Sequence, residues 1–377
     1  MKATPITIGG TLISAVSSTF GAGLLPDSKL ALYATVDASV EYTTNVFLNA
    51  EEEEDTIFYV TPGLAFSKNE GAIQINAYGG YEFQRYVDYS NNDAENVKSN
   101  ISVNFLGNSA INGGVYGGYN ETTSASGAIG DVTRTADSDA GGNVAYYVSE
   151  RTGLEAAGNY LYSDSKTAGY SDREIWWVSG GGFYDYSEAL TLNLDVRYRS
   201  TTVKDTDDAN DSDDIAAIVG ATGQLLPTVE GIAEVGIQHR KFDVSGEDDK
   251  TAPYFLIGAT WNMSDLTDVI LTVSQDFNTT SNNLSEDSFS IDLSLEHNFT
   301  EDFSGNIGAG YLDASYTAPL ASDERDDTQW SAFTGANYQF TDWGSIGLQL
   351  FYADRDSNVS EFEYKDFSAM LTASAQF

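Results

Sequence analysis

The stretch LTLNLDVRYR, residues 190–199, alternates apolar and polar side chains at every position. Successive side chains of a β-strand point to opposite faces, so this pattern predicts a strand with one apolar and one polar face. The segment FSIDLSLEH, residues 289–297, has the same form, with acids on its polar face. Repeated strands of about 10 residues with this two-faced character are typical of a barrel that meets lipid outside and water inside.

Runs of this kind recur from Leu30 to Phe377, and we count about 18 of transmembrane length. An even number lets the chain enter and leave the barrel on one side. The sequence therefore predicts an all-β fold, a transmembrane antiparallel up-and-down β-barrel. The expected strands begin near Lys29, Thr56, Ala72, Val97, Ala110, Ala140, Thr152, Glu174, Ala189, Ile215, Val229, Ala252, Val269, Asp287, Phe303, Thr328, Gly344 and Tyr364.

The expected connections alternate between short turns and long, acid-rich loops. Bacterial outer-membrane barrels place short turns in the periplasm and long loops outside, so both chain ends are predicted to be periplasmic. The longest expected loop is Glu121–Asp139.

The N-terminal residues read as a secretory signal, with Lys2 as the only early charge before a modestly apolar stretch of small residues. We expect a signal peptide over residues 1–23 and a single barrel over 24–377. No later segment has the roughly 18 apolar residues that a transmembrane helix requires. The absence of cysteine excludes disulfides and thiolate metal sites.

The chain has 57 acids against 18 bases, a formal net charge of -39. This charge repels phosphates and argues against nucleic-acid binding. Most acids fall in the long loops, where they would attract cations. The acidic loop residues singled out are Glu51, Glu52, Glu53, Glu54, Asp205, Asp207, Asp208, Asp211, Asp213 and Asp214.

A second set of charges falls on the polar strand faces and would line the interior. These predicted pore-lining residues are Asp37, Glu41, Glu82, Lys98, Glu155, Asp195, Arg197, Arg199, Glu230, Glu234, Asp276, Asp292 and Glu296. Acids outnumber bases, so an open lumen would favour cations. Alternatively, acids and bases pair across strands and only neutralise one another.

The acidic run at residues 205–214 invites a calcium interpretation, because oxygen-rich loops suit Ca²⁺. It lacks the glycine and glutamate of an EF-hand loop, so that motif fails. A solvated acidic surface, or loose Ca²⁺ or Mg²⁺ bridging to lipopolysaccharide phosphates, remains open. We expect no tightly bound cofactor.

Nothing in the sequence predicts an enzyme. The two histidines, His239 and His297, fall at opposite ends of their strands on the outward face, so they cannot share a catalytic site. No phosphate loop or nucleophile elbow is present. Trp177 would point inward, where it either stacks on a sugar ring or packs against a loop.

The segment EYTTNVF, residues 41–47, and residues 55–66 with the motif VTPGL resemble the opening of the putative beta-barrel porin type 2 family. The resemblance covers about a tenth of the chain. It implies a barrel in the bacterial outer membrane, and some members of the family look associated with export of surface polysaccharide. The terminal Phe377 resembles the signature read by the barrel-assembly machinery.

Three functions follow as hypotheses. The first is a porin-like channel for cations and small hydrophilic solutes. The second is an outer-membrane component of polysaccharide export with periplasmic partners. The third is a structural barrel whose loops bind a partner. In each, the partners of the barrel surface are outer-membrane lipid and lipopolysaccharide.

Overall fold

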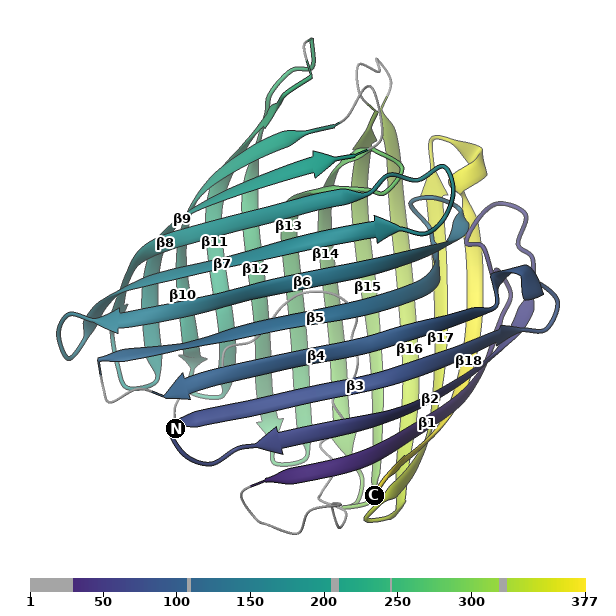
Figure 1. Ribbon diagram of the computed structural model, residues 1–377, viewed down its shortest axis with the longest axis horizontal. Coiled ribbons are helices and arrows are strands. Elements are labelled where there is room, and N and C mark those ends of the chain that lie inside the picture. The colour runs from purple at the N-terminus through teal and green to yellow at the C-terminus, as the bar shows by residue number, and fades with distance from the viewer. Residues whose placement is uncertain (1–29, 107–109, 205–209, 245, 319–323) are drawn as a thin grey trace.

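In the computed structural model, described for residues 30–106, 110–204, 210–244, 246–318 and 324–377, the chain forms one closed antiparallel sheet (Figure 1). Each strand pairs with its neighbours in chain order, and β1 closes the barrel against β18. The strands are β1 Ala31–Thr43, β2 Asp55–Lys68, β3 Ile73–Tyr86, β4 Ala94–Leu106, β5 Ile111–Ser126, β6 Asp131–Tyr147, β7 Thr152–Ser165, β8 Arg173–Asp185, β9 Leu190–Val203, β10 Ser212–Leu226, β11 Val229–Phe242, β12 Lys250–Ser264, β13 Thr267–Thr279, β14 Ser285–Asn298, β15 Phe303–Thr317, β16 Arg325–Thr341, β17 Gly344–Ser357 and β18 Tyr364–Gln376.

Two short 3-10 helices, η1 Ser90–Asn92 and η2 Ser360–Phe362, lie in outer loops. Among the residues that the structure describes, no helix is long and apolar enough to cross a membrane. The predicted signal peptide, residues 1–23, lies outside the described residues.

The alternation read from the sequence is confirmed as an inside and an outside of the barrel. Apolar side chains of one parity stand exposed on the outer wall: Leu64 is 54% exposed, Leu194 61% and Ile307 59%. Side chains of the other parity point into the barrel. An outer wall of this composition suits contact with hydrocarbon.

The closing seam joins β1 to β18 over nine registered pairs, from Thr35↔Gln376 to Thr43↔Ser368. The backbones of Ala34 and Phe377 extend it with hydrogen bonds in both directions, at 3.0 and 2.8 Å. The ring of Phe377 stacks on Trp343, with ring centroids 5.5 Å apart. The seam leaves neither β1 nor β18 with an unpaired edge over these residues, as a spanning sheet requires.

Expected and observed strand starts agree to within three residues, except for the sixth strand. The prediction of a long loop over Glu121–Asp139 was wrong. Strands β5 and β6 continue through it and pair from Ile111↔Tyr146 to Ser126↔Asp131. The sequence signal fails here because a strand that extends past the membrane needs no apolar face.

Candidate functional site

The interior wall is built from the polar faces of the strands. The register of each strand places the predicted pore-lining set on this inward face, opposite the exposed apolar parity. That set is Asp37, Glu41, Glu82, Lys98, Glu155, Asp195, Arg197, Arg199, Glu230, Glu234, Asp276, Asp292 and Glu296.

Charge is sorted along the barrel axis. In the described strands, the inward bases all lie in the outer halves, the halves next to the long loops: Lys98, Arg173, Arg197, Arg199, Arg240, Lys250, Arg325 and Arg355. The inward charges from mid-height to the periplasmic turns are all acids: Asp37, Glu155, Asp185, Asp195, Glu230, Glu234, Asp268, Asp292 and Glu296. The interior thus has an acidic inner half and a mixed outer half.

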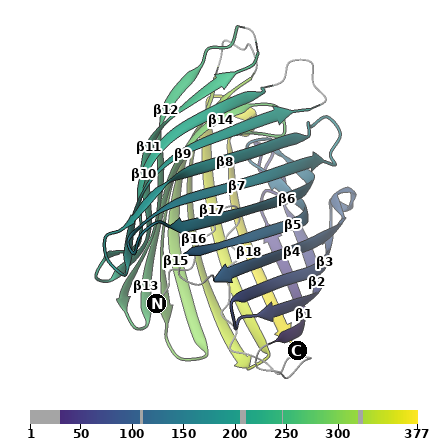
Figure 2. The ribbon, with the colours of Figure 1, turned by 60° about the vertical axis from the view of Figure 1, so that its left-hand side comes forward.

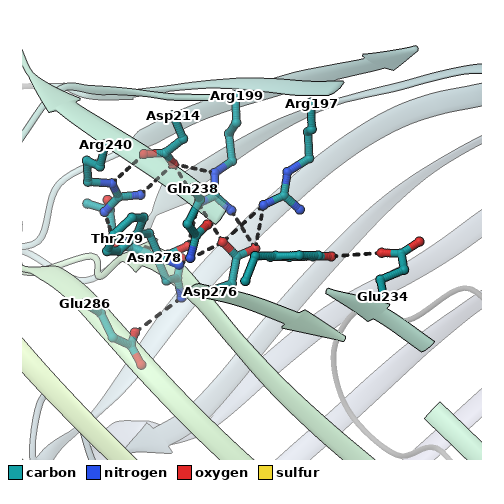
Figure 3. A network of polar contacts seen from close by, with 12 residues as sticks. Arg197, Arg199, Asp214, Glu234, Gln238, Arg240, Asp276, Asn278, Thr279 and Glu286 are labelled. Atoms are coloured by element: carbon teal, nitrogen blue, oxygen red, sulfur yellow. Dashed lines mark hydrogen bonds and ion pairs between the residues drawn. The ribbon is translucent and has the colours of Figure 1, made fainter. Parts of the chain in front are cut away.

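The outer half contains a cluster of ion pairs from four strands (Figure 3). Asp214 on β10 binds Arg199 of β9 at 2.6 Å and Arg240 of β11 at 2.7 Å. Asp276 on β13 accepts both Arg197 and Arg199, each at 3.1 Å. Arg240 is fully buried and Asp214 nearly so. These residues bear three positive and two negative charges, so the cluster nearly neutralises itself.

The cluster exists because the outer end of β13 lies inside the barrel. Strands β9 and β13 are not neighbours in the sheet, yet Arg199 donates to the carbonyl of Phe277 at 2.7 Å. Arg240 likewise donates to the carbonyl of Asn278 at 2.8 Å. Strand parity would turn Phe277 outward, but it is 1% exposed and lies against the Arg240 guanidinium, 4.8 Å away.

A second buried cluster lies on β15, β16 and β17 in the outer half. Asp327 on β16 lies between Arg355 and Arg325, the latter at 3.2 Å. The Arg325 guanidinium stacks on Tyr316, 4.1 Å from the ring centroid. These side chains are less than a tenth exposed. Pairing of these charges offsets the desolvation free energy that their burial costs.

The long β5–β6 hairpin reaches this second cluster. Its tip accepts a hydrogen bond from Arg325 at the carbonyl of Ala128, 2.9 Å away. Asn49, in the connection after β1, donates to Gly130 at 3.1 Å. Burial raises the pKa of the Tyr170 hydroxyl in the β7–β8 connection, and Asp131 of the hairpin adds to this rise. Figure 2 shows the outer connections around this end of the barrel.

The inner half has a different character. Every ion pair among the described residues involves an acid of the outer half or the outer rim. Glu155 has a buried carboxylate oxygen with no hydrogen-bond partner. Glu234 accepts the hydroxyl of Tyr254 at 3.2 Å and forms no ion pair with a described residue. Carboxylates without an ion pair make the electrostatic potential of the inner half negative.

Glycine makes room for one of these acids. A Cβ on Gly181 of β8 would lie 2.0 Å from an Asp195 carboxylate oxygen and 2.2 Å from the Leu194 carbonyl. The inward side chain of Asp195 therefore lies over the bare backbone of the neighbouring strand. On the outward face, the adjacent Gly180 has its nearest atom at 3.8 Å.

The predicted loop acids divide into three groups. Glu51, Glu52 and Glu54 are exposed and Glu53 is partly exposed, and Glu54 accepts the Tyr42 hydroxyl at 2.5 Å. Asp205, Asp207 and Asp208 lie outside the described residues. The remaining acids, Asp211, Asp213 and Asp214, surround the start of β10.

The prediction that Asp214 is a solvated loop acid was wrong, because β10 begins at Ser212 and turns it inward onto two arginines. Asp213 points to the outer rim and accepts the Tyr198 hydroxyl at 2.7 Å. Asp211 caps the backbone N–H of Val203 at 2.7 Å.

Sequence reasoning missed Arg173, Arg325, Asp327 and Arg355, which it left at or within expected loops. The available signal was period two: Arg325, Asp327 and Gln329 continue the inward parity of β16 beyond its apolar part. Trp177 is on the inward parity, registered beside Arg199 and Asn159.

The histidines are on separate strands, with His239 near Thr251 at 2.9 Å and His297 near Thr267 at 2.8 Å. In the described ranges, no group of three or more histidine or acidic side chains is arranged to hold a metal ion.

With this geometry established, comparison with known proteins identifies the family. The model of the family Putative beta-barrel porin 2 matches residues 190–377, from β9 to β18. The chain belongs to this family. The resemblance drawn from residues 41–66 pointed to the same family from a segment outside the matched range. No curated protein sequence matches the chain.

Solved structures show that this porin-family chain has the fold of outer-membrane channels. Pseudomonas aeruginosa OccK2 (OpdF), crystallised with glucuronate, is 13% identical, with a TM-score of 0.51, and the match covers 94% of this chain and 99% of that one. Pseudomonas aeruginosa OpdQ is 10% identical, with a TM-score of 0.50, and covers 93% and 99%. The ferric citrate transporter FecA is 10% identical, with a TM-score of 0.49; the match covers 90% of this chain and 63% of FecA. At these identities the likeness concerns the fold alone.

Proposed function

We propose that this barrel lies in the bacterial outer membrane and conducts small hydrophilic solutes, with preference for cations. The observation that carries the proposal is the all-acid inner half of the interior. A solute crossing the barrel meets carboxylates such as Glu155 and Glu234, which form no ion pair among the described residues. Fixed charge of one sign on a low-dielectric wall raises the local concentration of counter-ions and excludes co-ions.

The mixed outer half adds little net charge to this field. Around Asp214 and Asp276, the three arginines exceed the two acids by one charge, and the pairs satisfy one another. The exposed acids at residues 51–54 increase the cation concentration at the mouth. Their contribution depends on ionic strength, because solvated charges are screened over about 10 Å at 0.1 M salt.

A second function, a structural barrel with binding loops, has one observation in its favour. The outer half holds two buried side-chain clusters and the docked tip of the β5–β6 hairpin. If these groups block every solute, the barrel is a scaffold for its outer surface. Polysaccharide export gains no comparable support from the described residues.

The test is a planar-bilayer recording of the purified protein in asymmetric potassium chloride. The proposal predicts discrete conductance steps and a reversal potential toward the potassium equilibrium potential. Absence of steps under all conditions would favour the structural barrel. Steps with chloride preference would overturn the cation proposal while leaving a channel.

We also propose that Phe377, 48% exposed at the closing seam, is the residue that the outer-membrane assembly machinery reads. Its backbone completes the barrel while its ring stays accessible beside Trp343.

A further inference from the structure

The barrel wall is incompletely paired between β12 and β13. The two strands register from Ser264↔Thr267 up to Phe255↔Gln275 and no further. On the other side, β12 continues its pairing with β11 as far as Arg240↔Lys250. The outer part of β12, residues 250–254, is therefore not paired with β13 and has a free edge on that side.

A proline in this part of β12 limits pairing at the free edge. Pro253 has no N–H to offer to a neighbouring strand, and proline within sheets is confined to edges and irregularities. The carbonyl of Pro253 accepts the side-chain amide of Gln238 at 3.3 Å, and Gln238 is fully buried. Both backbone groups of Pro253 are thus unavailable for pairing with β13.

The departed segment, residues 276–286 of the β13–β14 hairpin, is held inside the barrel by polar contacts. Arg199 and Arg240 bind its carbonyls at 2.7 and 2.8 Å, and Arg240 also reaches the Ser285 hydroxyl at 3.1 Å. Arg173 of β8 binds the carbonyl of Thr279. Figure 3 shows Arg199 and Arg240 beside Asp276, Asn278 and Thr279 of the hairpin.

The turn of the hairpin is held by neighbouring connections. Ser171, between β7 and β8, donates its N–H to the carbonyl of Ser281 at 2.8 Å. Asn210, before β10, donates two hydrogen bonds to Asn283: its backbone N–H to the side-chain oxygen and its side-chain amide to the carbonyl, each at 2.8 Å. Strands β8, β9 and β11 and the connections before β8 and β10 thus hold one hairpin end in the outer half of the interior.

We propose that residues 276–286 form a gate that turns about Gln275, where the register with β12 ends. In the closed state the segment is docked against Arg173, Arg199 and Arg240; in the open state it lies back toward the β12 edge and clears the outer interior. The docking contacts are ion pairs and hydrogen bonds, which water can replace when the segment leaves its site. Switching segments that pack against a fixed wall move between discrete positions. Pro253 destabilises the open state, because it has no backbone N–H to donate to the returning segment.

This inference rests on the proposed channel function, so its test needs a readout that does not depend on conduction. The chain has no cysteine, which makes single introduced thiols specific reporters. Thr279 is 1% exposed in the docked hairpin, and Thr279→Cys is close to isosteric. A membrane-impermeant maleimide can modify it only when the segment leaves its site.

The labelling arm compares Thr279→Cys with Ser360→Cys, an exposed serine of η2, in the folded protein in lipid vesicles. We expect Thr279→Cys to react at a measurable rate, at least about 100-fold slower than Ser360→Cys, because the docked state dominates. Adding Pro253→Val, which restores an edge N–H, should increase the rate severalfold. A Thr279→Cys that stays unmodified while Ser360→Cys reacts fully would show a fixed hairpin and overturn the gate.

The conduction arm uses an introduced disulfide, called a staple below, that fixes the hairpin in its docked position. The hydrogen bond between the backbones of Ser171 and Ser281 brings them within the reach of a disulfide, for which Cα atoms lie about 4.4–6.8 Å apart. Ser171→Cys with Ser281→Cys should lack the large conductance state when oxidised and regain it on reduction. The control staple joins the registered pair Ser345 and Ser374 at the inner ends of β17 and β18, and its oxidation should change nothing.

The two arms separate the two proposals. Equal conductance before and after reduction of the Ser171–Ser281 staple would overturn the gate and leave the channel. Labelling of Thr279→Cys without conductance in any variant would overturn the channel function and, with it, the gating role of a hairpin that nevertheless moves.

Discussion

Both halves of the barrel interior carry acids, but the acids have different surroundings in the two halves. In the outer half, acids such as Asp214 and Asp327 are buried between arginines from several strands. In the inner half, acids such as Glu155 and Glu234 form no ion pair with any described arginine or lysine, although Arg197 lies over the ring of Tyr254, which binds Glu234. A carboxylate that is paired between guanidinium groups stabilises the fold, whereas a carboxylate without an ion pair makes the electrostatic potential of the interior negative. The position of the bases along the axis, rather than the total charge of the chain, decides which role an acid has.

Breaking the outer arrangement should give the largest effect. Asp214→Ala leaves Arg240, which is fully buried, and Arg199 without their shared acid. Removal of one partner from a buried ion pair costs about 3–5 kcal/mol. We expect a loss of this size in the free energy of unfolding, measured by urea unfolding in lipid vesicles with tryptophan fluorescence. The control is Glu230→Ala, an exposed inner acid, for which little change is expected; equal losses in both variants would contradict the comparison.

Crowding an inner acid should have an intermediate effect. Gly181→Val places a side chain on the Asp195 carboxylate and the Leu194 carbonyl. Overpacking of this kind typically costs about 1–3 kcal/mol. The matched control is Gly180→Val on the outward face, where the nearest atom is 3.8 Å from the new Cβ. If urea unfolding finds the two valine variants equally stable, the close fit between Gly181 and Asp195 is not a constraint.

Solvated acids at the mouth should matter least. Replacing Glu51, Glu52, Glu53 and Glu54 with glutamine removes charges that are exposed or partly exposed. We expect cation conductance to fall by up to about twofold at 0.1 M salt and to be unchanged at 1 M, where the Debye length is about 3 Å. Single-channel recordings at both salts measure this. A loss that persists at high salt would mean that these residues act by shape rather than by charge.

The sequence was sufficient for the barrel because lipid on one side and water on the other impose period two on every strand inside the membrane. Residues 190–199 and 289–297 predicted their strands and their inward faces correctly. The same reasoning failed at β6, where residues 131–139 extend past the membrane and both faces can be polar. It also failed at Arg325 and Arg355, for the same reason.

The ion-pair clusters could not be read from the sequence for a different reason. Parity gives the direction of a side chain but not the course of a strand, and Arg199 meets Asp276 only because β13 leaves β12 at Gln275. Pro253 marked the irregularity, since proline disfavours pairing at a strand edge. Nothing in the sequence indicated on which side of the wall the freed segment would lie.

The most direct test of the central claim compares the reversal potential of the natural chain with that of Glu155→Gln/Asp195→Asn/Glu234→Gln in a potassium chloride gradient at low salt. All three acids face the inner half of the interior and form no ion pair in the part of the chain that the structure describes, and these substitutions keep their shape. The account predicts that the reversal potential of the triple variant shifts toward zero, with the preference for potassium over chloride at least about twofold lower. An unchanged reversal potential in a conducting variant would contradict it.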